Sequence, residues 1–270
     1  MEYTTLQVEL SDSVATITLN RPDKANAMNE PMWHEIEAAM DWLDRTPEAR
    51  VGIITGSGKY FTTGIDLALL MSVAGKVQDE CEGRSREKLR RLILELQGTI
   101  SAIERCRKPV LAAVNGPCIG GGIDLISACD MRYCSDNAYF AVKEIDIGMT
   151  ADIGTLQRLP RLIGEGMARE LAYTGRHVEG NEAQAIRLVN RSFESPEALQ
   201  RGVLEMARTI AAKSPLAVRG CKEMITYARD HSVADSLNYI ATWNAAMLLS
   251  KDIYEAMGAN LQKRAPVFKD

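Results

Sequence analysis

Residues 109–135 read PVLAAVNGPCIGGGIDLISACDMRYCS and hold two strand-like runs on either side of a helical segment. Residues 109–116 form a short apolar run that ends in glycine, which is typical of a buried strand. Residues 120–130 open on three glycines and continue as a helix, and residues 131–135 form the next short strand. The order of strand, helix and strand predicts an α/β fold.

The segments before this stretch follow the same alternation. Residues 4–20 alternate apolar and polar side chains around a tight turn, which predicts a hairpin. Asn29 is a plausible N-cap for a helix that begins at residue 30. A strand is predicted at 51–56 and a long helix at 86–106.

After Ser195 the pattern is helical only. Four successive segments have helical periodicity: 195–213, 214–231, 233–250 and 251–264. The helical spacing of their apolar residues leaves much apolar surface that a tail without strands cannot cover by itself. We therefore predict an α/β core over residues 1–194 and a helical oligomerisation region over residues 195–270, although such a tail can also fold back on its own core.

Composition limits the classes of function. A formal net charge of −4 and a pI near 5.6 argue against a nucleic-acid partner. The six cysteines form no CxxC pair and the three histidines lie far apart, so we expect reduced thiols and no metal site. Neither a targeting signal nor a long apolar stretch is readable. We expect an intracellular soluble protein without a membrane span, cytoplasmic by default.

Acidic residues gather in one otherwise apolar segment. Residues 142–154 read VKEIDIGMTADIG and place Glu144, Asp146 and Asp152 within nine positions. The segment is either a solvated loop or a set of carboxylates held in a pocket for proton transfer. The glycine run at 120–122 is equally open, because it suits either close packing of helix and strand or an anion site at a helix N-terminus. It lacks the spacing of a dinucleotide fingerprint.

Four ordered motifs together resemble the crotonase, or enoyl-CoA hydratase/isomerase, superfamily. They read NRPDKANAMN, FTTGIDL, PVLAAVNGPCIGGGIDLISACDMRY and GTLQRLPRLIG, and the resemblance extends from about residue 4 to residue 265. It implies a spiral of repeated β-β-α units, a C-terminal helical region that forms trimers or hexamers, and an acyl-CoA thioester as substrate with no cofactor. It also implies an oxyanion hole made by the backbone N–H groups of Ile65 and Gly121.

The acidic residues are similar to those of one branch of this superfamily. The resemblance implies that enoyl-CoA hydratases have glutamates at the positions matching Asp124 and Glu144. They have a glycine where this chain has Asp152. The trio of acids here instead resembles the Δ3,5-Δ2,4-dienoyl-CoA isomerases of the β-oxidation of unsaturated fatty acids. The resemblance implies that Asp152 removes a proton from C2, that Glu144 delivers one to C6, and that Asp124 orients them. It also suggests a mitochondrial or peroxisomal enzyme.

Other residues have weaker assignments. The resemblance implies that the ligand's CoA moiety contacts Arg21, Lys24, Ala25 and Asp66, although a solvated Lys24 is a nearly equal alternative. We expect Asp146, His34 and His177 to be non-catalytic. Residues 76–91 are charged and are expected to form an exposed flap over the acyl site.

Three rival functions stay open at this point. A hydratase would use Asp124 and Glu144 to add water to a 2-enoyl-CoA. A crotonase-like dehalogenase would use Asp152 as a nucleophile, but such enzymes lack an acid matching Glu144. A non-catalytic binding protein of this fold is the third, and it is disfavoured by the acidic net charge and by the intact trio of acids.

Overall fold

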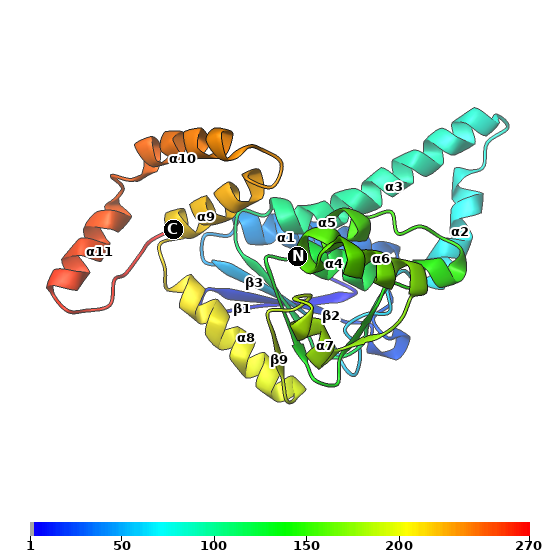
Figure 1. Cartoon of the computed structure of the whole chain (residues 1–270), viewed down its shortest axis with the longest axis horizontal. Helices are drawn as coiled ribbons and strands as arrows, with labels where there is room; N and C mark the ends of the chain where they lie inside the picture. The colour runs from blue at the N-terminus through cyan, green and yellow to red at the C-terminus, as the bar shows by residue number, and fades with distance from the viewer. Residues whose placement is uncertain (1–2) are drawn as a thin grey trace.

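The computed structural model describes residues 3–270 and has two sheets surrounded by helices (Figure 1). The main sheet runs in the order β1-β2-β3-β4-β6-β9, with an antiparallel β1-β2 hairpin and parallel pairing elsewhere. Its strands are β1 (Leu6–Ser11), β2 (Val14–Leu19), β3 (Val51–Gly56), β4 (Val110–Val114), β6 (Met131–Ser135) and β9 (Arg191–Phe193). The smaller sheet contains β5 (Cys118–Ile119), β7 (Tyr139–Ala141) and β8 (Val178–Glu179).

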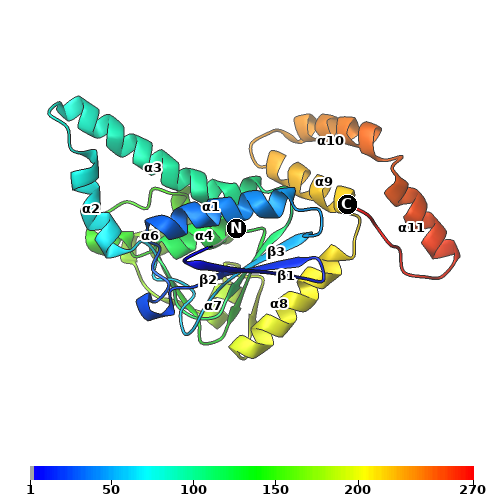
Figure 2. The ribbon, with the colours of Figure 1, turned by 180° about the vertical axis from the view of Figure 1, so that it is seen from behind.

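Helices cover both faces of the main sheet. On one face lie α1 (Glu30–Arg45), α3 (Glu82–Arg105) and α4 (Gly121–Ala128), and their apolar side chains meet those of the sheet in the larger core cluster. On the other face lies α8 (Pro196–Ala211), and Figure 2 shows it on the side of the strands opposite to α1. The buried residues of α8 recur every four positions at Leu199, Val203, Ala207 and Ala211, which is the apolar stripe of a helix packed on a sheet.

The remaining helices lie beside α3 and α4, against the smaller sheet, or in a separate tail. They are α2 (Leu67–Val77), α5 (Thr155–Ile163), α6 (Glu165–Thr174), α7 (Gly180–Ala185), α9 (Pro215–Tyr227), α10 (Val233–Met247) and α11 (Lys251–Leu261), with short 3₁₀ turns at η1 (Pro22–Lys24) and η2 (Glu144–Ile147). Successive strand, strand and helix units, such as β4, β5 and α4, confirm the predicted spiral architecture.

Some local features differ from the predictions or were not predicted. The helix predicted at 86–106 begins at Glu82, and α2 was not predicted at all. The proposed flap at 76–91 is therefore mostly helical, and α2 and the exposed half of α3 project together from the core (Figure 1). Residues 144–147 form a 3₁₀ turn, for which the sequence analysis made no prediction.

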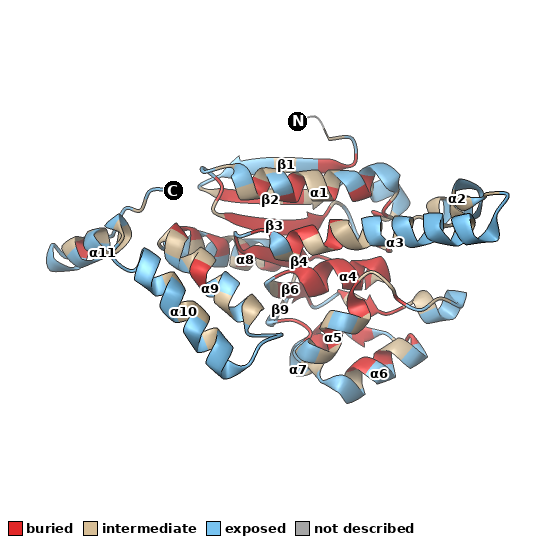
Figure 3. Cartoon of the chain, turned by 90° about the horizontal axis from the view of Figure 1, so that it is seen from above, coloured by how far each residue is buried: buried red, intermediate tan, exposed pale blue. Residues whose placement is uncertain are grey.

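The tail leaves the core after α8. Figure 3 shows α10 and much of α11 as exposed at the side of the molecule, whereas strands β2, β3, β4 and β6 are mostly buried. Among the described residues, the exposed apolar side chains of this tail include Ile225 at 71%, Val233 at 77%, Leu237 at 62% and Leu261 at 84%. Although the predicted region starts at residue 195, α8 belongs to the core, and only α9 to α11 project from it. Across residues 3–270 we find no helix with the length and hydrophobicity to cross a bilayer.

Candidate active site

Two backbone segments meet closely where the Thr62–Asp66 loop reaches the glycine run. Ile119 N donates to Thr62 O at 3.0 Å. Gly64 has a φ of 83°, and a side chain there would put its Cβ 2.8 Å from Ile119 O and 2.9 Å from Gly121 N. Only glycine combines this backbone conformation with so close an approach. The glycine in the loop is thus what allows Ile65 to lie beside the start of α4.

The backbone N–H groups of Ile65 and Gly121 lie beside the same cavity. Met28 N donates to Gly64 O at 2.8 Å and Asp66 N donates to Met28 O at 3.0 Å. Because these neighbours bond toward Met28, the N–H of Ile65 points to the opposite side of its strand-like segment. Gly121 is the first residue of α4, where N–H groups have no acceptor within the helix. Both residues line one cavity, so the structure brings the predicted oxyanion pair together.

This cavity has a volume of about 250 Å³ and apolar walls. Trp33 of α1 and Met149 form part of its lining, and Trp33 is oriented by a hydrogen bond from Nε1 to Met28 O at 3.1 Å. Helices α2 and α3 supply six further apolar side chains: Leu70, Val73, Leu89, Leu92, Ile93 and Leu96. Its ionisable lining residues are Glu144 and Asp152. A carboxyl in such surroundings loses hydration, which disfavours its charged form.

Glu144 begins the η2 turn and faces the glycine run. Its Oε1 lies 3.2 Å from the position that a Cβ would take at Gly120, and its Oε2 is buried without a hydrogen-bond partner among the described residues. Burial raises the pKa of Glu144 to about 7, with a smaller contribution from the charge of Asp124. At neutral pH this carboxyl is therefore poised between its protonated and ionised forms.

Asp124 lies beneath the cavity and not on its surface. Its side chain is fully buried in α4, and Oδ1 accepts a hydrogen bond of 2.6 Å from Thr155 N at the start of α5. A carboxylate at this end of a helix interacts favourably with the helix dipole. Burial nonetheless raises the pKa of Asp124 to about 6, and the charge of Asp152 adds to the shift. Asp124 thus ties α4 to the segment that carries Asp152.

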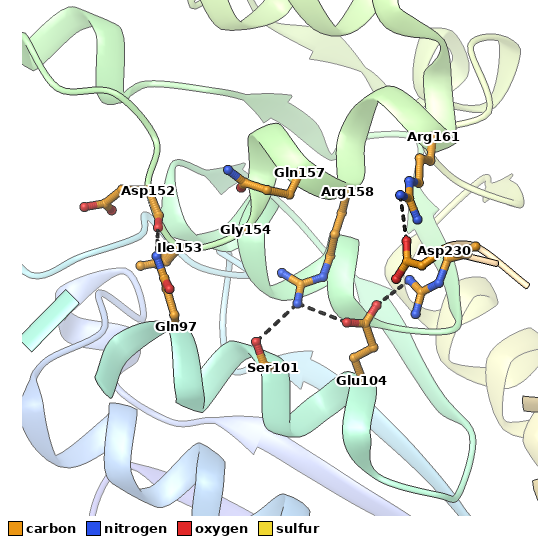
Figure 4. Close-up of a pocket in the computed structure, with 11 residues that line it drawn as sticks. Gln97, Ser101, Glu104, Asp152, Ile153, Gly154, Gln157, Arg158, Arg161 and Asp230 are labelled. Carbon is orange, nitrogen blue, oxygen red and sulfur yellow. Dashed lines mark hydrogen bonds and ion pairs between the residues drawn. The ribbon is translucent and has the colours of Figure 1, made fainter. Parts of the chain in front are cut away.

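Asp152 is half-buried, and burial raises the pKa of its carboxyl. It lies in an irregular segment just before α5, and its backbone carbonyl accepts a hydrogen bond of 2.6 Å from Gln97 Nε2 (Figure 4). Sequence reasoning missed both Gln97 and Arg158, whose guanidinium lies against Gly154. Gln97 and Asp152 are 55 residues apart, so no local sequence signal could have linked them.

The predicted CoA-binding residues lie at the η1 turn and at the N-terminus of α2. Arg21 Nη1 and Asp66 Oδ2 form an ion pair at 3.0 Å, so these two residues first of all hold η1 to the start of α2. Lys24 is exposed, and Ala25 adopts a φ of 50°. Asn26, which we did not single out from the sequence, is fully buried and donates through Nδ2 to Ser57 O at 2.9 Å and Tyr60 O at 2.8 Å.

The residues expected to be non-catalytic lie away from the cavity. Asp146 is exposed and pairs with Lys143 Nζ at 2.7 Å. His34 lies 3.8 Å from Glu95 on the surface, and the ring of His177 stacks on that of Tyr139. All six cysteines are free thiols, four of them buried.

Comparisons with known proteins agree on the family. A sequence model of the enoyl-CoA hydratase/isomerase family matches residues 9–270. The chain is 46% identical over 270 residues to the peroxisomal Delta(3,5)-Delta(2,4)-dienoyl-CoA isomerase of Arabidopsis thaliana, covering 98% of this chain and 97% of that protein. It is 44% identical over 264 residues to the mitochondrial human protein of the same name, covering 97% and 80%.

A hydratase relative and a hydratase structure are more distant. The crotonyl-CoA hydratase of Syntrophomonas wolfei is 35% identical over 269 residues, with 99% of each chain covered. The crystal structure of an enoyl-CoA hydratase from Bacillus anthracis superimposes with a TM-score of 0.89 at 31% identity, covering 98% of this chain and 99% of that one.

The raised pKa of Glu144 predicts a pH-dependent effect of Glu144→Gln on stability. The pKa is about 7 in the folded chain against an ordinary 4.5, so this group's stabilising contribution is complete below about pH 4.5 and is lost as the pH rises through about 7. A neutral glutamine avoids that loss. Urea unfolding should show the variant gaining about 1–3 kcal/mol over the parent between about pH 5 and about pH 8.

The matched control is Asp146→Asn, which removes an exposed carboxylate of the same segment. Its stability difference from the parent should change little over that pH range. A constant difference between parent and Glu144→Gln would show that burial does not disfavour the ionised Glu144.

Proposed function

The chain belongs to the enoyl-CoA hydratase/isomerase family, and on that basis we propose that it is a Δ3,5-Δ2,4-dienoyl-CoA isomerase acting in the β-oxidation of unsaturated fatty acids. The observation that carries the proposal is the pair Glu144 and Asp152 on the wall of one apolar cavity, with Asp124 directly behind them. Relatives with this name are peroxisomal in one organism and mitochondrial in another.

The reaction needs two separated proton transfers. Conversion of a 3,5-dienoyl thioester to the conjugated 2,4-dienoyl form removes a proton from C2 and adds one at C6. The electron pair of the broken C–H bond spreads through the diene and the thioester carbonyl. One carboxyl cannot reach both carbons, which is why two acids on different parts of the wall suit this reaction.

In the proposed mechanism Asp152 is the base at C2 and Glu144 the acid at C6. The pKa of about 7 lets Glu144 carry a proton in the resting site. Asp152 is only half-buried and would act as the ionised partner. The two transfers leave Asp152 protonated and Glu144 ionised, and exchange of one proton between them, directly or through solvent, restores the enzyme.

The N–H groups of Ile65 and Gly121 would hold the thioester oxygen while it carries negative charge. Removal of one such donor from an oxyanion hole costs roughly 3 kcal/mol in other enzymes. Neither residue needs a reactive side chain for this role, and the side chain of Ile65 serves as cavity wall. Because acids and amides supply both proton transfer and charge stabilisation, we propose that the reaction needs no added cofactor.

We propose further that the CoA moiety lies along the loop of Arg21, Lys24 and Ala25, near Asp66. The exposed Lys24 offers a positive charge to a phosphate, whereas Arg21 and Asp66 shape the loop through their ion pair.

The substrate test compares 3,5-dienoyl-CoA with 2-enoyl-CoA, each with and without a chelator. The proposal predicts growth of the conjugated dienoyl absorbance at a rate that the chelator does not change. Rapid loss of the 2-enoyl absorbance without any dienoyl product would instead identify a hydratase.

Substitution of the acids tests their roles. Asp152→Asn and Glu144→Gln should each lower kcat for the dienoyl substrate by roughly a hundredfold or more, with little change in KM, because each removes one positioned proton-transfer group. Asp146→Asn, the matched control on the exposed side of η2, should keep nearly full turnover. Full activity of Asp152→Asn would refute the assignment of the base.

We also propose that α9 to α11 mediate a homotrimer, or a hexamer made of two trimers. The support is the set of large apolar side chains that this tail exposes, because contiguous exposed apolar surface marks interaction sites. A closed ring would let each tail meet an equivalent surface of its neighbour.

Sedimentation should report a trimer or hexamer for the intact chain. Ile225→Lys and Leu237→Lys, at positions 71% and 62% exposed in the single chain, should lower the oligomeric state because they place charge in the interface. Leu10→Lys, at an apolar position of β1 that is 41% exposed, is the control. An intact chain that is monomeric and fully active would rule out the proposed assembly.

A further inference from the structure

A second cavity, of about 410 Å³, lies behind the catalytic segment (Figure 4). It is polar, and its lining comes mainly from α3 and α5 and from the residues that follow α9. Asp152 borders both this cavity and the apolar one, so the residue forms part of the wall between them. In Figure 4 its carboxyl group points away from Gln97, whereas its backbone carbonyl points toward that side chain.

Helix α3 contributes to both cavities with successive parts of its length. Leu92, Ile93 and Leu96 line the apolar cavity. Gln97, Ser101 and Glu104 line the polar one. Residues spaced by four and then three positions lie on one face of a helix, so these polar side chains form a row along α3. One rigid element therefore sets the acyl wall and faces the back of the Asp152 segment.

The first contact of this row is the hydrogen bond from Gln97 Nε2 to Asp152 O at 2.6 Å. Residues 150–153 belong to no helix or strand, and the segment is flanked by Gly148 with a φ of 74° and Gly154 with a φ of 141°. Such a segment has no regular ladder of backbone hydrogen bonds to fix it. A side-chain donor from a long helix can supply that restraint.

The second contact holds the start of α5. Arg158 Nη2 lies 3.3 Å from Ser101 Oγ and 3.2 Å from Glu104 Oε2. The Arg158 side chain is only 14% exposed, and a Cβ on Gly154 would collide with its guanidinium. Together with the bond from Thr155 N to Asp124, these contacts restrain the residues that follow Asp152. Gln97 restrains Asp152 itself.

We propose that Gln97 is a positioning residue for Asp152, holding its backbone so that its carboxyl faces the acyl cavity at the height of C2. This inference rests on the proposed function, in which Asp152 removes the C2 proton. Small misplacement is costly in such a step, because an error of about 1 Å in a reacting group can lower the rate by about a hundredfold.

The test uses Gln97→Met, which keeps the length of the side chain but removes the donor. Gln157→Met is the matched control, because Gln157 is exposed on α5 and lines the same polar cavity. We expect Gln97→Met to lower kcat for 3,5-dienoyl-CoA by about tenfold to a hundredfold with KM nearly unchanged. Its kinetic isotope effect with C2-deuterated substrate should rise, and Gln157→Met should behave as the parent.

A double-mutant cycle separates positioning from general loss of structure. If Gln97 acts through Asp152, Gln97→Met should add little to the defect of Asp152→Asn. Additive losses, or a Gln97→Met enzyme with the parent's kcat and isotope effect, would overturn the proposal.

Hydrogen exchange of the peptide around residues 148–156 gives a readout without substrate. Gln97→Met should exchange faster than both Gln157→Met and the parent, and equal protection would count against the proposal. A parent chain that did not isomerise dienoyl-CoA would refute the proposed function, and this exchange comparison would still decide whether Gln97 restrains the segment.

Discussion

Three carboxyl groups lie in or directly behind one small apolar cavity, and the chemistry of the site depends on their partial loss of hydration. Burial raises the pKa of Glu144 to about 7 and that of Asp124 to about 6, and it also raises the pKa of Asp152. Each group differs in its remaining contacts. Asp124 accepts a hydrogen bond from the backbone at the N-terminus of α5. Asp152 is half-buried, and Glu144 Oε2 has no hydrogen-bond partner among the described residues. These differences let one carboxyl carry a proton while another is ionised.

The surrounding fold supports this unfavourable arrangement. Gly64 permits the loop of Ile65 to touch the glycine run, which places two N–H groups at the cavity. Helix α4 carries Asp124. Helix α3 carries apolar side chains that line the cavity and polar side chains that bond to Asp152 and Arg158. A site that disfavours its own charges needs rigid elements around it, because otherwise the loop could relax toward solvent. The packed sheet and helices are therefore a requirement for the acidic cavity.

Much of the fold was predictable because its signals are local. The apolar runs at 51–56 and 110–114 are strands, and the glycine-opened segment is α4, close to where the pattern predicted them. The missed helix α2 begins at the end of the FTTGIDL motif, which was interpreted only for the N–H group of Ile65 and for Asp66 as a CoA contact. The 3₁₀ turn that carries Glu144 had no local signal in the sequence.

The site was only partly predictable. The motifs and the resemblance that they carry indicated Asp124, Glu144, Asp152, Ile65 and Gly121. They did not indicate that Asp124 binds Thr155 N, that Arg21 and Asp66 pair with each other, or that Gln97 reaches Asp152. Those contacts join residues far apart in the chain and arise only when the elements pack. Periodicity and motif spacing carry no information about them.

The central claim, that two different acids serve two different carbons, is tested most directly by following deuterium in D₂O with NMR. Glu144→Gln should still exchange the C2 hydrogen of 3,5-dienoyl-CoA with solvent, because Asp152 is intact, but should form hardly any product labelled at C6. Asp152→Asn should exchange hardly any hydrogen at C2. Equal loss of C2 exchange in both variants would contradict the assignment of separate roles.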